Sequence, residues 1–163
     1  MIRFILTLAI ALLAVLPGVC RDNGDRALDA IFDEYRHTDG ADYVYINPFF
    51  TKLISLGTIT SSCHGITGKL KSVRVLSIDS ASDHTRRGLA GRISSLTSSG
   101  YEELIRVSDN GEKVRILARM DRKKPDTARR LLIFAEENGE CDVVCIDGKF
   151  SRDDLARIIS ENQ

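Results

Sequence analysis

The sequence YEELIRVSDNGEKVRILARM, residues 101–120, decides the fold. Asn-Gly at positions 110 and 111 is the preferred central pair of a type I′ β-turn, which joins two antiparallel strands. The residues on both sides of this pair are rich in valine, isoleucine and other residues that favour strands. The stretch therefore predicts a β-hairpin made of strands 101–108 and 112–120.

The register of this hairpin follows from its two-residue turn. Val107 then faces Val114, and the same register pairs Ile105 with Ile116 and Glu102 with Arg119. Apolar side chains meet apolar ones and an acid meets a base, which makes the pairing self-consistent.

A second Asn-Gly pair lies at positions 138 and 139 and follows the apolar run Leu131–Phe134. Residues 128–137 are open to two interpretations, because Pro125 can begin a helix and Gly139 can end one. A strand is favoured, since four consecutive apolar residues leave a helix without a polar face. As a second hairpin, the segment sets Phe134 opposite Val143 and Ile133 opposite Val144.

Helices and further strands surround the two hairpins in irregular order. Apolar residues at helical spacing predict helices over 25–37, over 48–56, after Ser82 and after Ser151, where Asp154 nearly completes a capping box. Residues 43–46 and 70–78 have the composition of strands. This pattern indicates an α+β fold, with a mostly antiparallel sheet of about five to six strands, two Asn-Gly hairpins and about four helices packed on it.

Both hairpins carry apolar residues on both of their faces. A sheet that alternates apolar and polar residues has one face in water, and these strands do not alternate in that way. Either helices cover both sides of the sheet or a second chain covers one of them, so a homodimer is among the expectations.

The first twenty residues have the pattern of an export signal. Arg3 precedes an apolar run over 4–16, which Pro17-Gly18 ends; thirteen residues suit a signal peptide better than a membrane-spanning helix. We expect a signal peptide at 1–20, one domain at 21–163, and a place in the periplasm or at the outer membrane. Three fates remain open: cleavage that removes Cys20, lipoprotein processing that acylates it, or retention as an anchor or buried helix.

The balance of basic and acidic residues limits the kinds of partner that we expect. The chain has 23 basic and 23 acidic residues, and loss of Arg3 with the signal leaves 22 against 23. Nucleic acids and anionic membrane surfaces select proteins with a clear basic excess. Nucleic acid is therefore disfavoured as a partner, and membrane contact is expected only through a lipid on Cys20.

Cys63 and His64 form the best nucleophile-and-base pair in the sequence, and they suggest a small thiol-dependent hydrolase as an alternative function. Adjacent residues rarely turn their side chains toward each other in a productive geometry, so a pair of exposed loop residues is the simpler interpretation. The spacings typical of zinc sites and phosphate-binding loops do not occur. We expect no cofactor and no metal, and the sequence favours a protein that is not an enzyme.

Cys141 and Cys145 lie on one predicted strand. A rise of about 3.3 Å per residue separates them by about 13 Å, whereas a disulfide needs Cα atoms within about 7 Å. Two buried core cysteines are therefore expected, and a disulfide from Cys63 to either of them stays open.

The first hairpin also sets Arg106 directly opposite Arg115, with Arg119 farther along the same strand. Like charges that face each other destabilise a strand pair unless an anion lies between them. A carboxylate from a neighbouring strand or simple solvation would suffice. The sharper hypothesis is a basic sheet face that binds an acidic partner through Arg106, Arg115 and Arg119.

The order of motifs along the chain resembles that of a known family. An early amphipathic helix is followed by YVYINPFF at 43–50, VLSI at 75–78, GYEELIRV at 100–107, GEKVRI at 111–116 and IDGKF at 146–150. This order is similar to that of the exported Bacteroidota family described as domain of unknown function number 4252. The resemblance implies an envelope location and supplies no catalytic residue.

Together these observations favour an exported envelope protein that acts as a non-catalytic binding or interaction module for an unknown envelope protein or ligand. The alternatives are the thiol hydrolase that uses Cys63 and His64, and a structural lipoprotein that is acylated at Cys20.

Overall fold

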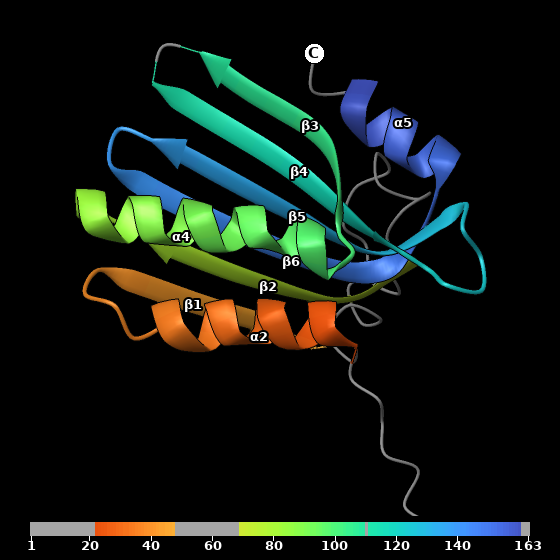
Figure 1. Cartoon of the computed structure of the whole chain (residues 1–163), viewed down its shortest axis with the longest axis horizontal. Helices are drawn as coiled ribbons and strands as arrows, with labels where there is room; N and C mark the ends of the chain where they lie inside the picture. The colour runs from red at the N-terminus through yellow and green to blue at the C-terminus, as the bar shows by residue number, and fades with distance from the viewer. Residues whose placement is uncertain (1–21, 48–68, 110, 161–163) are drawn as a thin grey trace, which may run out of the picture.

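A six-stranded antiparallel sheet organises the chain (Figure 1). The computed structural model describes residues 22–47, 69–109 and 111–160. The strands lie in the order β1-β2-β6-β5-β4-β3, so the last strand in sequence occupies an interior place. Their bounds are β1 (Ala41–Ile46), β2 (Leu70–Ile78), β3 (Glu102–Asp109), β4 (Glu112–Met120), β5 (Thr127–Glu137) and β6 (Glu140–Ser151).

Both predicted hairpins are present. In the first, β3 and β4 pair Val107 with Val114 and Ile105 with Ile116, as the sequence predicts. In the second, β5 and β6 pair Phe134 with Val143 and Ile133 with Val144, so residues 128–137 form a strand and not a helix. The turn between them has positive φ at both Asn138 and Gly139, which a type I′ turn requires.

The predicted pairing of Glu102 with Arg119 is wrong. β3 contains a bulge between Glu103 and Ile105, and beyond it Glu102 pairs with Ala118. A bulge places two residues of one strand opposite one residue of the other, which shifts every later pair by one.

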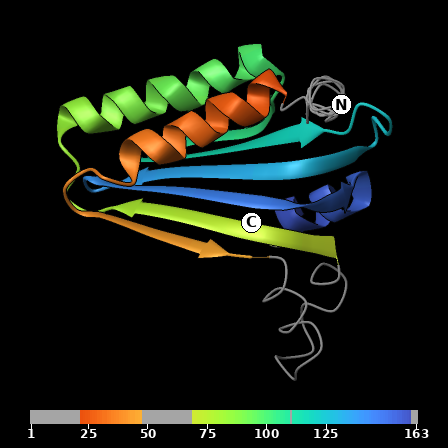
Figure 2. The same ribbon diagram turned by 90° about the horizontal axis from the view of Figure 1, so that it is seen from below.

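Two helices cover one face of the sheet, as Figure 2 shows. They are α2 (Asn23–Tyr35) and α4 (Asp83–Ser95), and α4 continues into the short 3-10 helix η2 (Leu96–Ser99). Ser82 caps α4 by accepting a hydrogen bond from the Thr85 N–H, 3.1 Å between N and Oγ.

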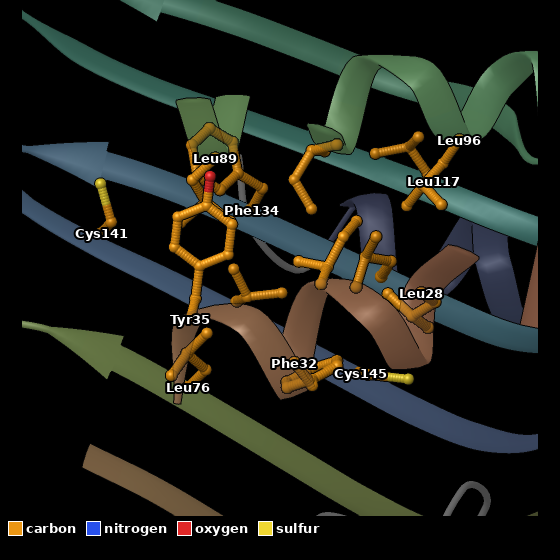
Figure 3. Packing of buried hydrophobic residues seen from close by; sticks show 14 of the residues in the cluster. Leu28, Phe32, Tyr35, Leu76, Leu89, Leu96, Leu117, Phe134, Cys141 and Cys145 are labelled. Atoms are coloured by element: carbon orange, nitrogen blue, oxygen red, sulfur yellow. The ribbon is translucent and has the colours of Figure 1, made fainter. Parts of the chain in front are cut away.

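The main core lies between these helices and the sheet (Figure 3). Leu28 and Phe32 of α2 and Leu89 of α4 are buried against strand residues that include Leu117 and Phe134. Each such side chain stabilises the fold by about 1.5–3 kcal/mol through removal of apolar surface from water.

The third helix, α5 (Arg152–Ser160), packs on the opposite face at one end of the sheet. Its buried Leu155 joins a second cluster with Ala118, Leu131 and Phe150. The expected cap is present: the Ser151 N–H and hydroxyl both donate to Asp154 Oδ2 at 2.8 Å, and the Asp154 N–H donates to Ser151 Oγ at 3.3 Å.

The helix count differs from the expected four. The described residues contain three α-helices and η2, while the helix predicted over 48–56 lies outside them, as do the segment 1–20, Cys63 and His64. Among the described helices, none has the length and apolar character needed to cross a membrane.

Candidate functional site

The structure supplies the anion that the facing arginines require. Glu103 accepts hydrogen bonds from Arg106 Nε to Oε1 at 2.6 Å and from Arg115 Nε to Oε2 at 2.9 Å. In a regular strand, residues three apart point to opposite faces. The bulge at Leu104 removes that difference and brings Glu103 to the same face as Arg106.

The two arginines hold Glu103 in its charged form. Hydrogen bonds from Arg106 and then Arg115 lower the pKa of Glu103 to about 2. Arg115 is buried and also donates to Ser94 Oγ of α4 at 2.7 Å. These residues therefore join β3, β4 and α4, and a single carboxylate bridges the two arginines within the chain.

Arg119 lies apart from these residues, near the other end of β4. It is buried, donates to Asp22 and to the Ser99 carbonyl, and its guanidinium lies 5.5 Å from the centre of the Tyr101 ring. Gly100 has a φ of 88°, and a Cβ there would collide with Arg119 Nη1. Arg119 thus connects the start of α2 to the end of η2. It does not form a common surface with Arg106.

A cleft of about 330 Å³ lies between α2 and the β1–β2–β6–β5 part of the sheet, lined by alternating aspartates and arginines. Arg74 donates to Asp29 at 2.7 Å, and Arg130 Nη1 donates to Asp25 at 3.0 Å. Asp147 accepts from Arg130 and from Ser72. The remaining lining residues are Tyr43 and Tyr45.

The groups around this cleft are held in unreactive forms. Burial raises the pKa of the Cys145 thiol, 3.6 Å from Arg74 Nη2, to about 11. Burial likewise raises the pKa of Tyr101 to about 12. A thiol or phenol with such a pKa stays protonated near neutral pH and makes a poor nucleophile or base.

Cys141 and Cys145 are both fully buried on β6 and have free thiols, as the predicted strand implies. His37 and His84 are exposed on different elements. Within the ranges that the structure describes, no group of three or more His, Cys, Asp or Glu residues could hold a metal ion.

The face of the sheet opposite α2 and α4 carries aliphatic side chains on every strand. Strand pairing places one unbroken row across it, and shorter rows flank that row on both sides. Val44 and Val107, near its two edges, are 52% and 50% exposed. We call this surface the open face: Val44, Val75, Val144, Ile133, Ile116 and Ile105, with Ile46 and Val73 on one side and Ala135, Val114 and Val107 on the other.

Only one described helix, α5, packs on the open face, at the end where β6 finishes. At the opposite end, where the two hairpins turn, the residues on this face are acidic. We call them the acidic rim: Asp42, Asp109, Glu112, Glu137, Glu140 and Asp142.

The acidic rim contains two unfavourable pairs. Asp109 lies directly across from Glu112, and Glu137 directly across from Glu140. Like charges in this position destabilise a strand pair. Among the described residues, no lysine or arginine forms an ion pair with any of these four carboxylates, whereas Glu103 and Glu136 on the other face are both paired.

Lysines gather at the end of the molecule where α5 lies. Lys123, Lys124 and Lys149, which we call the lysine end, line a cleft of about 300 Å³ beside the N-terminus of α5. All three are exposed. Lys69 and the acidic residues Asp121 and Asp154 line the same cleft, and Lys69 is paired with Asp154 at 2.7 Å.

Sequence reasoning missed the aspartate–arginine cleft. Its signal was present, because Asp22, Asp25 and Asp29 recur at helical spacing beside the apolar stripe of α2. Arginines also occupy inward-facing strand positions at 74 and 130, where apolar residues are usual.

Comparisons with known proteins agree with the resemblance noted in the sequence. A model of the family described as "Domain of unknown function (DUF4252)" matches residues 35–158, which cover all six strands, α4 and most of α5. No curated protein matches the chain, and no solved structure matches it. Because the family model spans well over half of the sequence, the chain belongs to the DUF4252 family.

Proposed function

We propose that the protein is an exported, non-catalytic interaction module of the cell envelope that binds a protein partner through the open face. The observation that carries the proposal is the unbroken aliphatic row across all six strands, bordered by the acidic rim. The partner it fits is a protein surface with an apolar centre and cations at one border.

The size of the open face supports binding. Strands about 4.8 Å apart and side chains about 7 Å apart along one face give each residue about 34 Å², so the open face covers roughly 370 Å². The largest apolar patch on a monomeric protein typically covers about 300–600 Å² and is often functional. An antiparallel sheet that needed only water on this face would carry polar side chains there.

The polar clusters favour a structural role over chemistry. In the cleft, the carboxylates of Asp25, Asp29 and Asp147 are all engaged by arginines. Each of these carboxylates therefore already has a cationic partner within the chain. The nearby thiol of Cys145 is protonated at neutral pH.

Export rests on the N-terminal pattern, in which a basic residue, a thirteen-residue apolar run and a Pro-Gly break precede Cys20. The proposal leaves both processing routes at Cys20 open.

Site-specific photo-crosslinking in the cells that make the protein tests this function. A photoreactive phenylalanine analogue placed at Val44 or Val107 should crosslink to protein, because both side chains are exposed on the open face. The same analogue at His84 or Arg87, exposed on α4 across the sheet, is the matched control. Equal crosslinking from both faces, or none from Val44 and Val107, would contradict the proposal.

A further inference from the structure

We infer that the partner of the open face is a second copy of this chain, packed face to face in an antiparallel two-fold dimer. The inference rests on the proposed function, because it names the partner of the surface described there. Three features of the described residues carry it: the distribution of charge, the position of α5 and the area available.

The distribution of charge indicates that the partner is a second copy and that its strands run in the opposite direction. The acidic rim lies at the hairpin end of the open face, where no lysine or arginine of the described residues pairs with its two sets of facing carboxylates, while the lysine end lies at the opposite end of the same molecule. A two-fold axis in the interface and perpendicular to the strands reverses the strand direction. Each acidic rim then meets the partner's lysine end, and the contact is made twice.

The alternative two-fold axis, parallel to the strands, fails on two counts. It would bring the two acidic rims together, which adds repulsion to the like-charged pairs already present. It would also stack α5 on α5 at one end and hold the sheets apart. In the antiparallel arrangement the two α5 helices lie at opposite ends of the interface. Each helix then limits how far the hairpins of the partner extend along the sheet.

The area is sufficient for a specific but modest contact. The open face and the acidic rim together have seventeen residues, and at about 34 Å² per residue two copies remove about 1,100 Å² from water, which is near the lower limit for a biological interface. Two sheets packed in this way would lie about 10 Å apart, as in a β-sandwich. With 22 basic and 23 acidic residues after signal loss, two copies carry almost no net repulsion.

The inference is tested on the purified mature chain by light scattering and sedimentation over about 1–200 µM, a range that suits a modest interface. We expect the mass to rise from monomer to dimer with concentration, and the dimer to weaken as NaCl increases from about 0.05 to about 0.5 M. A single monomeric species at the highest concentration would overturn the inference.

Charge exchange locates the interface. Glu137→Lys with Glu140→Lys, and separately Lys123→Glu with Lys124→Glu, should each weaken dimerisation about tenfold or more. The chain that carries all four changes should regain the wild-type affinity, since it restores opposite charges across the interface. Arg87→Glu on α4 is the control and should leave the affinity unchanged, with circular dichroism confirming that every variant is folded.

The outcomes separate this inference from the proposed function. A dimer that neither of the two double variants weakens uses another surface, and the inference is then wrong. A monomer that still crosslinks to a different protein from Val44 and Val107 also overturns the dimer, while the interaction function stands. Crosslinks from these positions to a second copy of the chain support both.

Discussion

At the scale of single residues, charged side chains on the helix-covered face form ion pairs that hold neighbouring elements together. Glu103 joins Arg106 to Arg115, and Asp22 binds Arg119 beside Gly100. An arginine at an inward-facing strand position therefore indicates a carboxylate on a neighbouring strand or on the element that packs over it. The acids of the open face have no such counterpart among the described residues, which makes that face chemically different.

Glu103→Gln should destabilise the protein by about 2–4 kcal/mol, because Arg115 would keep its charge in a buried position without its counter-ion. Urea denaturation measures the free energy of unfolding. Glu102→Gln is the matched control: its side chain is exposed, and the change should alter stability by less than about 0.5 kcal/mol. Equal effects from the two variants would contradict the role given to Glu103.

Cys141 and Cys145 should resist alkylation at neutral pH until the protein unfolds. Both are fully buried, and burial raises the pKa of each thiol to about 11, so the reactive thiolate is scarce and inaccessible. Mass spectrometry after iodoacetamide treatment, with and without denaturant, measures the difference. Rapid labelling of either cysteine in the folded protein would refute this prediction.

At the scale of secondary-structure elements, the accuracy of sequence reasoning depended on how local the cause was. The hairpin registers could be predicted, because an Asn-Gly turn fixes the pairing of the strands beside it. The cap of α4 at Ser82 is equally local. The bulge at Leu104 has no local signature, and it moved Glu102 away from Arg119 and brought Glu103 to Arg106.

The strand order and the cleft were also beyond local patterns. β2 pairs with β6, and about seventy residues of sequence separate the paired positions. The residues of a turn predict only the pairing of the strands beside it, so they do not predict such a distant contact. The ion pairs between α2 and the inner strands follow from that arrangement. The apolar character of both sheet faces, by contrast, was visible in the hairpins.

The cap of α5 should make the stability of the protein depend on pH. Hydrogen bonds from Lys69 and then from Ser151 lower the pKa of Asp154 to about 2, below its value of 3.8 in an unfolded chain. The unfolded state then binds more protons, so this stabilisation is present above about pH 5 and is lost as the pH falls toward 2. Lys69 is partly exposed, which limits the contribution of that pair.

Asp154→Asn should therefore lower the free energy of unfolding by about 1–2 kcal/mol at pH 7, and the difference from wild type should shrink at about pH 2–3. Denaturant titrations across this pH range measure both quantities. Asp153→Asn, exposed on the same turn of α5, is the control. A difference that stays constant with pH would show that the Asp154 charge does not contribute.

At the scale of the whole molecule, the sheet is covered unequally. α2 and α4 cover one face, while the other has α5 at one end and aliphatic side chains over the rest. The fold thus provides a rigid platform whose exposed surface is spread over six strands. Substitutions on this platform should affect binding more than stability.

Export predicts that the mature chain has a lower mass than the full sequence. The full sequence of 163 residues has a mass of 18.1 kDa, and cleavage after Cys20 would leave a chain that begins at Arg21. Intact-mass spectrometry of protein from the cell envelope distinguishes this product from one that begins at an acylated Cys20. Recovery of the uncleaved chain in the soluble cytoplasmic fraction would contradict export.

The interior position of β6 has a consequence for the timing of folding. β6 is the last strand to be made, and β1 with β2 can join the rest of the sheet only through it. β1 and β2 can pair with each other early, but this pair joins the rest of the sheet only when nearly all of the protein has emerged from the ribosome. Completion of the sheet is therefore among the last steps of folding, and a chain that has not yet made β6 leaves one edge of β2 and one edge of β5 unpaired.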